Sequence, residues 1–328
     1  MAEQDNYDKN LHASAARERR HFLPANSIGY FSPLRQQHVQ KGAKGRRRNR
    51  AVWVLRRGQT KARQDTPNRV ANARDVYHPG MGPHYDVDNY FKVFESMNDE
   101  AVTSLLLEQA ERKSFNAWIR LAAYVSSRIA RNPDAEFRLV QDEDNPWQPE
   151  QRGIGYVMAM QRISAAVLRA RWAFLISDHE DFIINDRGFT GLLVPPWKSP
   201  GLLVPLRKKC AVVLGTGPFP KPTSWTGIDW QIEIPSHSVT DEQMRRYNAL
   251  SWIGCRDEAY GSSAEALCAA RDMHTSVPDQ MHSLALADAM FTILGGTIED
   301  HMRDELLLLR LVNGLPDPID FDPLRLLV

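Results

Sequence analysis

The segment Ser177–Asp181, called the acidic turn below, places three carboxylates and an imidazole between two apolar runs, and Asp186 and Arg187 follow it. Such groups at a strand end can act as general acid and base or hold a divalent metal, because the strand fixes their geometry while the turn stays open to a ligand. The alternative is a polar hairpin turn whose Ser and Asp side chains bond the local backbone. Both interpretations stay open, with Asp178, His179 and Asp186 as candidate catalytic or metal-binding residues.

Cations form a second group of candidates. Residues 1–75 hold 17 Lys and Arg against 6 Asp and Glu, and the rest of the chain holds 24 against 34. Six cations fall between Lys41 and Arg50, and the arginines among them are Arg46, Arg47, Arg48 and Arg50. This run predicts a solvated loop that, with Arg56 and Arg57 just beyond it, could neutralise several phosphates of a nucleic acid. It could instead dock on the acidic body of the same chain or only maintain solubility.

Further candidates follow later in the chain. Arg187, Arg207 and Lys208 are possible contacts for phosphate or carboxylate, and the alternative is a solvated strand end paired with the acidic turn. Asn248, Trp252 and Arg256 recur at four-residue steps in a segment predicted to be helical from Asn248 to Gly261. A stripe of amide, indole and guanidinium can bind a polar ligand, or it can join parts of the fold.

Several function classes are disfavoured by absent motifs. The sequence has no phosphate-cradling G-x-x-x-x-G-K-[ST], no dinucleotide G-x-G-x-x-G and no G-x-S-x-G. Cys210, Cys255 and Cys268 form no close pair, so neither a disulfide framework nor a thiolate zinc site is indicated. No apolar run approaches the roughly 20 residues that span a bilayer, and the opening residues lack a signal-peptide pattern. We therefore expect a cytoplasmic protein without a membrane partner.

Both helices and strands are expected to position these residues. Apolar spacing predicts a helix after Ser114 that ends near Asn132, a second helix from about Ile154 to Leu168, and a third that opens with a capping box of Thr240 and Gln243. Strands are expected at 50–58, 182–185, 201–206, 210–215 and 229–234, with a sheet packed by the first two helices beside the acidic turn. Short separations favour antiparallel hairpins, which predicts an α+β fold with a mostly antiparallel central sheet flanked by two groups of helices. The expected boundaries are a polar extension at 1–20, one domain at 21–314 with a basic loop at 40–50, and a tail at 315–328.

The segments "RHFLPANSIGYFS", "RAVWVLRRG" and "RVANARDVY", followed by "WAFLISDHEDFIIND" and "RYNALSWIGCRDEAYG", span roughly residues 20–261. In order and spacing they resemble the domain of unknown function 4238 family, although His179-Glu180 stands where many members have Pro after the Ser-Asp pair. The resemblance implies no particular reaction. It does imply that His21, Asp178 and Asn248 occupy recurring polar positions of the family pattern, so we expect them to converge on one pocket or on one polar network.

Two functional hypotheses follow. In the first, the protein acts on or binds a phosphate-bearing or nucleic-acid ligand, with a divalent metal as a possible cofactor. Bacterial defence against foreign nucleic acid would suit such a ligand, although no residue indicates it. In the second, it is a non-catalytic interaction protein with a structural polar core and a basic loop that binds a partner.

Overall fold

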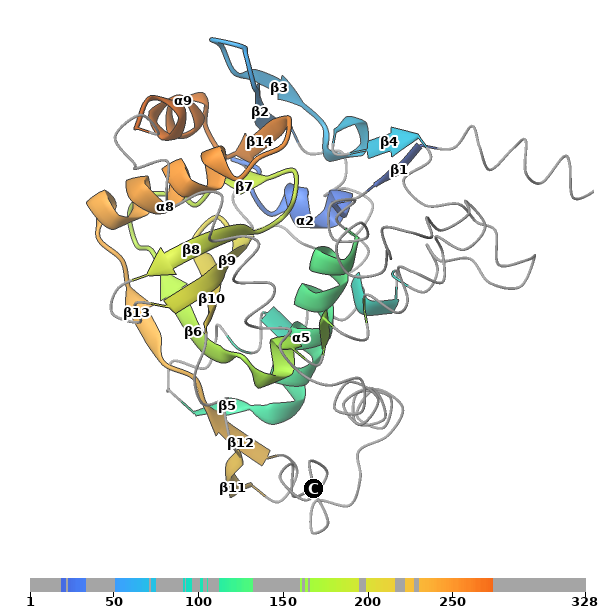
Figure 1. The fold of residues 1–328 in the computed structure, drawn as a ribbon, viewed down its shortest axis with the longest axis vertical. Helices are drawn as coiled ribbons and strands as arrows, with labels where there is room; N and C mark the ends of the chain where they lie inside the picture. Colours follow the sequence, from blue (N-terminus) through green and yellow to red (C-terminus); the bar gives the residue numbers. More distant parts are fainter. Residues whose placement is uncertain are drawn as a thin grey trace, which may run out of the picture.

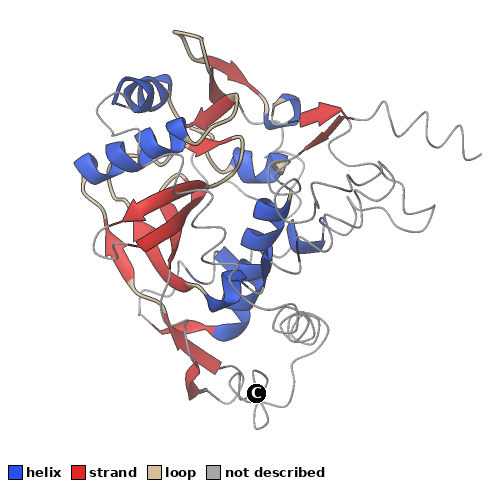
Figure 2. Cartoon of the chain, viewed as in Figure 1, coloured by secondary structure: helices blue, strands red, loops and turns tan. Residues whose placement is uncertain are grey.

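The computed structural model describes the chain in separate stretches. These are residues 19–21, 23–33, 51–70, 72–74, 112–131, 166–194, 199–215, 222–226 and 230–273, with single residues and short pieces at 91, 93–95, 101–102, 105, 160 and 163–164. Within them, helices pack against several small sheets (Figures 1 and 2). The fold class is α+β, as the sequence predicts.

The central sheet carries the acidic turn at one of its strand ends. Its five strands run in the order β13 (Ser236–Ser238), β6 (Arg171–Ile176), β10 (Cys210–Gly215), β9 (Ser199–Arg207) and β8 (Thr190–Val194). All neighbours are antiparallel except β13, which pairs parallel to β6. The β9–β10 connection is only Lys208 and Lys209, as a hairpin requires. The prediction of a mostly antiparallel sheet is confirmed.

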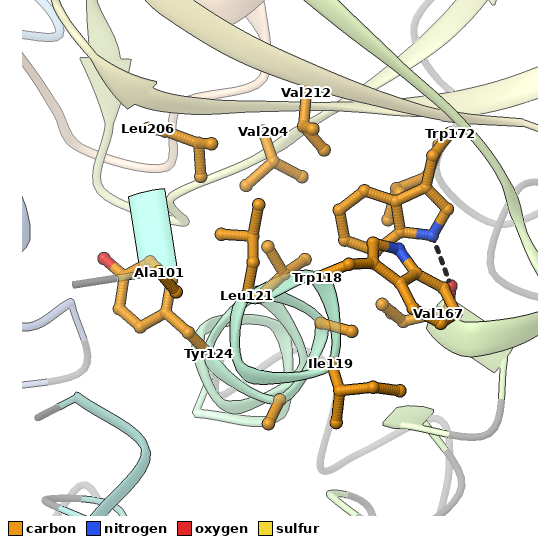
Figure 3. Close-up of a cluster of buried hydrophobic side chains, with 14 of the residues drawn as sticks. Ala101, Trp118, Ile119, Leu121, Tyr124, Val167, Trp172, Val204, Leu206 and Val212 are labelled. Carbon is orange, nitrogen blue, oxygen red and sulfur yellow. Dashed lines mark hydrogen bonds between the residues drawn. The ribbon is translucent and has the colours of Figure 1, made fainter. Parts of the chain in front are cut away.

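Helix α5 (Phe115–Ala130) covers one face of this sheet. Ser114 caps it by accepting a hydrogen bond from the Ala117 N–H at 3.1 Å, which satisfies one of the unpaired donors at a helix start. Leu121 points from α5 toward Val204 and Val212 of the sheet, and Trp118 points toward Trp172, which it meets edge to face at 5.9 Å between ring centroids (Figure 3). The predicted helix and its cap are confirmed.

The opposite face packs against elements from both ends of the chain. Leu203 and Val213 belong to a core shared with α2 (Ala25–Gly29), with Met244 of α8 (Asp241–Ile253) and with Val54. Strand β2 (Val52–Arg56) belongs to a second sheet, ordered β3 (Arg63–Asp65), β2, β14 (Glu258–Gly261) and β7 (Ile184–Asn185). This second sheet joins the N-terminal strands to the segment just after the acidic turn.

The remaining elements form two smaller sheets, a 3-10 turn and a helix. A three-stranded sheet contains β11 (Pro222–Trp225), β12 (Trp230–Glu233) and β5 (Arg112–Ser114), and β1 (Arg19–His21) pairs with β4 (Asn72–Arg74). A 3-10 turn at Pro67–Arg69 and helix α9 (Ala264–Met273) complete the described elements.

The predicted helix from Asn248 to Gly261 is wrong in its second half. Thr240 and Gln243 form the expected capping box, but α8 ends at Ile253 and residues Glu258–Gly261 form β14. A Cβ at Gly254 would collide with the Thr190 hydroxyl, so the chain turns where only glycine fits. β14 is then inserted between β2 and β7, and these tertiary pairings override the local helical pattern.

Candidate functional site

The backbone of the acidic turn is held by hydrogen bonds from the turn itself and from the β9–β10 hairpin. The Ser177 hydroxyl donates to the Glu180 carbonyl at 2.6 Å. The Lys209 ammonium donates to the carbonyls of His179 and Glu180, at 2.5 and 3.1 Å. The Ser177 and Phe182 N–H groups donate to the Lys209 and Lys208 carbonyls, at 3.0 and 2.7 Å. The turn is therefore a fixed element of the sheet end.

Helix α8 holds the second half of the same turn through Asn248. The Asn248 side chain accepts from the Ile183 N–H at 3.0 Å and donates to the Asp181 carbonyl at 2.9 Å. This side chain is buried, so both backbone groups would lose their partners without it. Asn248 and the acidic turn do converge, and the contact joins the amide to the backbone of the turn.

Two carboxylates of the acidic turn have protein partners. The Asp181 carboxylate is 2.8 Å from the Lys209 ammonium and accepts from the Ser262 hydroxyl at 2.6 Å. Glu180 pairs with Arg245 of α8 at 2.8 Å. Asp178 and His179 differ, since both are exposed and neither side chain bonds to any other residue in the described part of the chain. They are the two ionisable groups of the turn that face solvent without such a partner.

Asp186 lies just after β7 and is buried. Its carboxylate accepts hydrogen bonds from three consecutive N–H groups in the turn between α8 and β14: Arg256 at 2.8 Å, Asp257 at 2.6 Å and Glu258 at 3.1 Å. Burial raises the pKa of Asp186, although the three N–H donors act in the opposite direction. The contacts of Asp186 are those of an anchor between β7 and β14.

The candidate phosphate contacts are dispersed. The Arg207 guanidinium lies over the Tyr30 ring at 5.0 Å from its centroid, and Arg187 and Lys208 are partly buried. Trp252 is buried in a small core between α8, β14 and α9. Arg256 is exposed and lies beyond the end of α8, so the expected stripe of Asn248, Trp252 and Arg256 along one helix is wrong.

Several candidates lie where the structure describes little or nothing. The backbone of His21 belongs to β1, where it pairs with Asn72, but its side chain is outside the described residues. Arg46, Arg47, Arg48 and Arg50 are also outside them. The expected meeting of His21 with Asp178 and Asn248, and the loop that the four arginines are predicted to form, stay predictions.

Residues 51–70, called the cationic hairpin below, contain a charged surface that the sequence interpretation only partly identified. They hold five Lys or Arg against one acid, Asp65, and all five cations are exposed: Arg56, Arg57, Lys61, Arg63 and Arg69. Lys61 and Arg69 make no side-chain bond to the rest of the described chain. The charge balance of this stretch was the available signal, because it continues the excess of the run that ends at Arg50.

Arg57 ties the cationic hairpin to α8. Its guanidinium donates to the carbonyls of Ile253 and Cys255, at 2.6 and 3.0 Å. A cation at a helix C-terminus satisfies the last carbonyls and complements the helix dipole. On the other side, the Arg271 guanidinium of α9 donates to the Thr60 carbonyl at 2.6 Å. The hairpin is thus fixed against both helices.

No group of three or more His, Cys, Asp or Glu side chains within the described residues is arranged to hold a metal ion. None of the described helices is both long and apolar enough to cross a membrane. Comparison of the chain with protein-family models, curated proteins and solved structures found no match. The resemblance to the domain of unknown function 4238 family therefore stays a prediction.

Proposed function

We propose that this protein binds nucleic acid through its phosphate backbone, with the cationic hairpin and the preceding Arg46–Arg50 segment as the contact surface. The observation that carries the proposal is the five exposed cations of residues 51–70 against a single acid. They follow directly on the six cations of residues 41–50, so about thirty residues of chain would present positive charge to one ligand.

Asn248 of α8 and Asp186 after β7, which hold the surroundings of the acidic turn, enter this proposal as scaffold. Asn248 and Asp186 direct their side chains at backbone groups, and the network they complete holds α8, β7 and β14 together. α8 and β14 in turn contact the cationic hairpin through Arg57 and through the β2–β14 pairing. A rigid scaffold of this kind places cations at fixed spacing, which lowers the entropy cost of binding.

The first test is a salt series of DNA and RNA binding. Neutralising Lys61 and Arg69 to Gln should lower the slope of log affinity against log salt by about one for each phosphate that is no longer neutralised. A matched control neutralises Arg245 and Arg246 of α8, which are exposed and carry the same charge. Equal behaviour of the two double variants would remove the hairpin from the interface.

The second test addresses the segment before β2. Replacing Arg46, Arg47, Arg48 and Arg50 with Gln should weaken binding more than the hairpin variant does, since four charges are removed instead of two. Unchanged affinity would limit the interface to the hairpin. No binding by the intact protein would overturn the proposal and favour an interaction protein with another partner.

A second candidate function is catalysis on the same ligand by Asp178 and His179. It is supported by their exposure at the tip of a turn whose backbone is fixed from three elements, since acid-base groups work best on rigid supports. The test is an assay of nucleic-acid and phosphoester cleavage with Asp178→Asn and His179→Gln. Activity that survives both substitutions, or is absent from the intact protein with divalent metal added, would eliminate this candidate.

A further inference from the structure

Two arginines of the cationic hairpin share one carboxylate. Arg56 on β2 donates through both Nε and Nη2 to the Oε1 of Glu258 on β14, at 2.9 and 2.5 Å. Arg63 on β3 brings its Nη2 within 3.9 Å of the same oxygen and within 3.5 Å of the Asp65 carboxylate. The second oxygen of Glu258 accepts from the Tyr260 hydroxyl at 3.2 Å. Three neighbouring strands thus meet at one ion cluster.

The cluster is arranged with its cations outward. The side chains of Arg56 and Arg63 are 51% and 50% exposed, whereas those of Glu258 and Asp65 are 9% and 18% exposed. The two carboxylates hold the guanidinium groups from beneath and present little negative charge to solvent. A guanidinium carries five N–H donors, and Arg56 directs two of them at Glu258. The other three donors of Arg56 bond to no residue in the described part of the chain, so they can meet a ligand.

This geometry distinguishes the pair from the other cations of the hairpin. Lys61 and Arg69 are exposed, and no carboxylate among the described residues orients them, whereas Arg57 directs its donors at the end of α8. Arg56 is held by hydrogen bonds to Glu258 on the adjacent strand, and Arg63 lies within ion-pair distance of Asp65 on its own strand and of Glu258, so binding restricts their side-chain freedom less. Planar guanidinium groups fixed in this way suit paired hydrogen bonds to phosphate oxygens.

We propose that Arg56 and Arg63 form a phosphate clamp that grips one phosphodiester group of the nucleic acid, and that Glu258 is the positioning residue that aims both guanidinium groups. This inference rests on the proposed nucleic-acid binding and assigns the contact within it that depends on geometry. The remaining cations of the hairpin then add charge with little directional requirement, while the clamp sets where the backbone of the ligand lies.

The first test conserves charge. Arg56→Lys and Arg63→Lys keep the positive charge but remove the paired donors, so each should weaken binding of a fixed DNA or RNA oligonucleotide by about five- to tenfold at constant salt. The matched control is Arg246→Lys, because Arg246 also pairs with a carboxylate, Glu242, at 2.6 Å on the solvent-facing side of α8. The control should bind as the wild type does. Wild-type affinity in both hairpin variants would overturn the clamp.

In the second test, a positioning role and a simple charge effect of Glu258 predict opposite changes in nucleic-acid affinity. Glu258→Gln removes a negative charge beside a site for a polyanion, and this change alone would strengthen binding. If Glu258 positions both arginines, the same substitution should instead weaken binding by several-fold, because the guanidinium groups are no longer oriented. Asp257→Asn removes the same charge from the preceding residue, which is 72% exposed. This control should bind equally or more tightly. Tighter binding by Glu258→Gln than by the wild type would overturn the positioning role.

Two further measurements keep the outcomes distinct. The melting temperature of each variant is measured first, and Arg63→Lys carries the test if Glu258→Gln fails to fold, because the Arg63 ion pairs lie at the surface. Binding that falls with Lys61 and Arg69 neutralised but not with the Lys-for-Arg exchanges would retain the proposed function and reject the clamp. No binding by the wild type would reject both.

Inorganic phosphate is the second probe, and it should compete with the oligonucleotide better than chloride does at the same ionic strength. Equal competition by the two anions would count against the clamp.

Discussion

In and around the acidic turn most polar groups are bonded to the protein itself, whereas in the cationic hairpin all five cations are exposed and two of them, Lys61 and Arg69, bond to no other described residue. Asn248 and Asp186 accept hydrogen bonds from backbone N–H groups. The Lys209 ammonium donates to two backbone carbonyls and pairs with the Asp181 carboxylate. Lys61 and Arg69 do neither within the described chain.

The contrast shows that residue type is a weak guide to a binding site. Carboxylates, amides and an imidazole in sequence suggest chemistry, but a buried polar group must first be satisfied, and a fold commonly uses such groups to fix its own loops. Hydrogen-bond donors that the fold does not use for its own bonding are a better indication of a binding site. Glu258 belongs to both patterns, since it is buried and yet directs its partners outward.

The largest expected effect is the loss of the Asp186 anchor. Asp186→Ala would leave three backbone N–H groups without their acceptor, so the free energy of unfolding should fall by about 3 kcal/mol or more. Asp178→Ala, at an exposed carboxylate, should change it by less than about 0.5 kcal/mol. Urea denaturation followed by circular dichroism measures both. Similar losses in the two variants would contradict the division between scaffold and surface.

The next effect concerns the hold of α8 on the acidic turn. Asn248→Ala removes two buried hydrogen bonds to the turn and should cost about 2 kcal/mol of stability in the same denaturation experiment. Asn248→Asp keeps an acceptor for the Ile183 N–H but turns an oxygen toward the Asp181 carbonyl, so it should be at least as destabilising. Wild-type stability for Asn248→Ala would show that the turn is held without this helix.

A smaller effect separates two neighbouring cations of the hairpin. Arg57→Gln removes the bonds to the Ile253 and Cys255 carbonyls and should cost about 1 kcal/mol of stability. Lys61→Gln should leave stability within about 0.5 kcal/mol of the wild type, because no described residue bonds that side chain. The comparison would fail if Lys61→Gln were the more destabilising of the two.

The smallest effect on stability is expected at Cys255, the buried thiol between α8 and β14, and it is visible in the rate of alkylation and in the pH dependence of stability. Burial is the main cause that raises the pKa of Cys255 to about 11, so at pH 8 the folded protein should react with an alkylating reagent only as fast as it opens. The unfolded chain ionises this thiol at lower pH, and its contribution to stability is therefore lost as the pH rises toward about 11. Mass spectrometry of the labelled peptides measures the rate, and rapid labelling at pH 8 would place Cys255 at an accessible surface.

Local patterns were sufficient for the elements whose signals are mutually consistent. Ser114 with the apolar spacing behind it predicted α5, and Thr240 with Gln243 predicted the start of α8. The runs at 201–206 and 210–215 predicted a hairpin because only three residues separate them, and in the structure Lys208 and Lys209 connect β9 to β10. These features depend on residues that are close together in the chain, so the sequence shows their spacing directly.

Prediction failed where distant pairing decides the outcome. The residues after Asn248 have helical spacing, yet Gly254 must pass close to Thr190 and β14 must fill the gap between β2 and β7. The acidic turn was ambiguous for the same reason, since its partners come from α8 and from the β9–β10 hairpin. Glu258 gave no signal at all, because its relation to Arg56 exists only once β14 pairs with β2.

By itself, the sequence determined the charge division between a basic head and an acidic body, the α+β class, and the caps and hairpins that local chemistry specifies. The tertiary structure decided which polar groups are used up by the fold and which remain available, because that depends on burial and on acceptors brought from segments some two hundred residues away, as between Arg56 and Glu258.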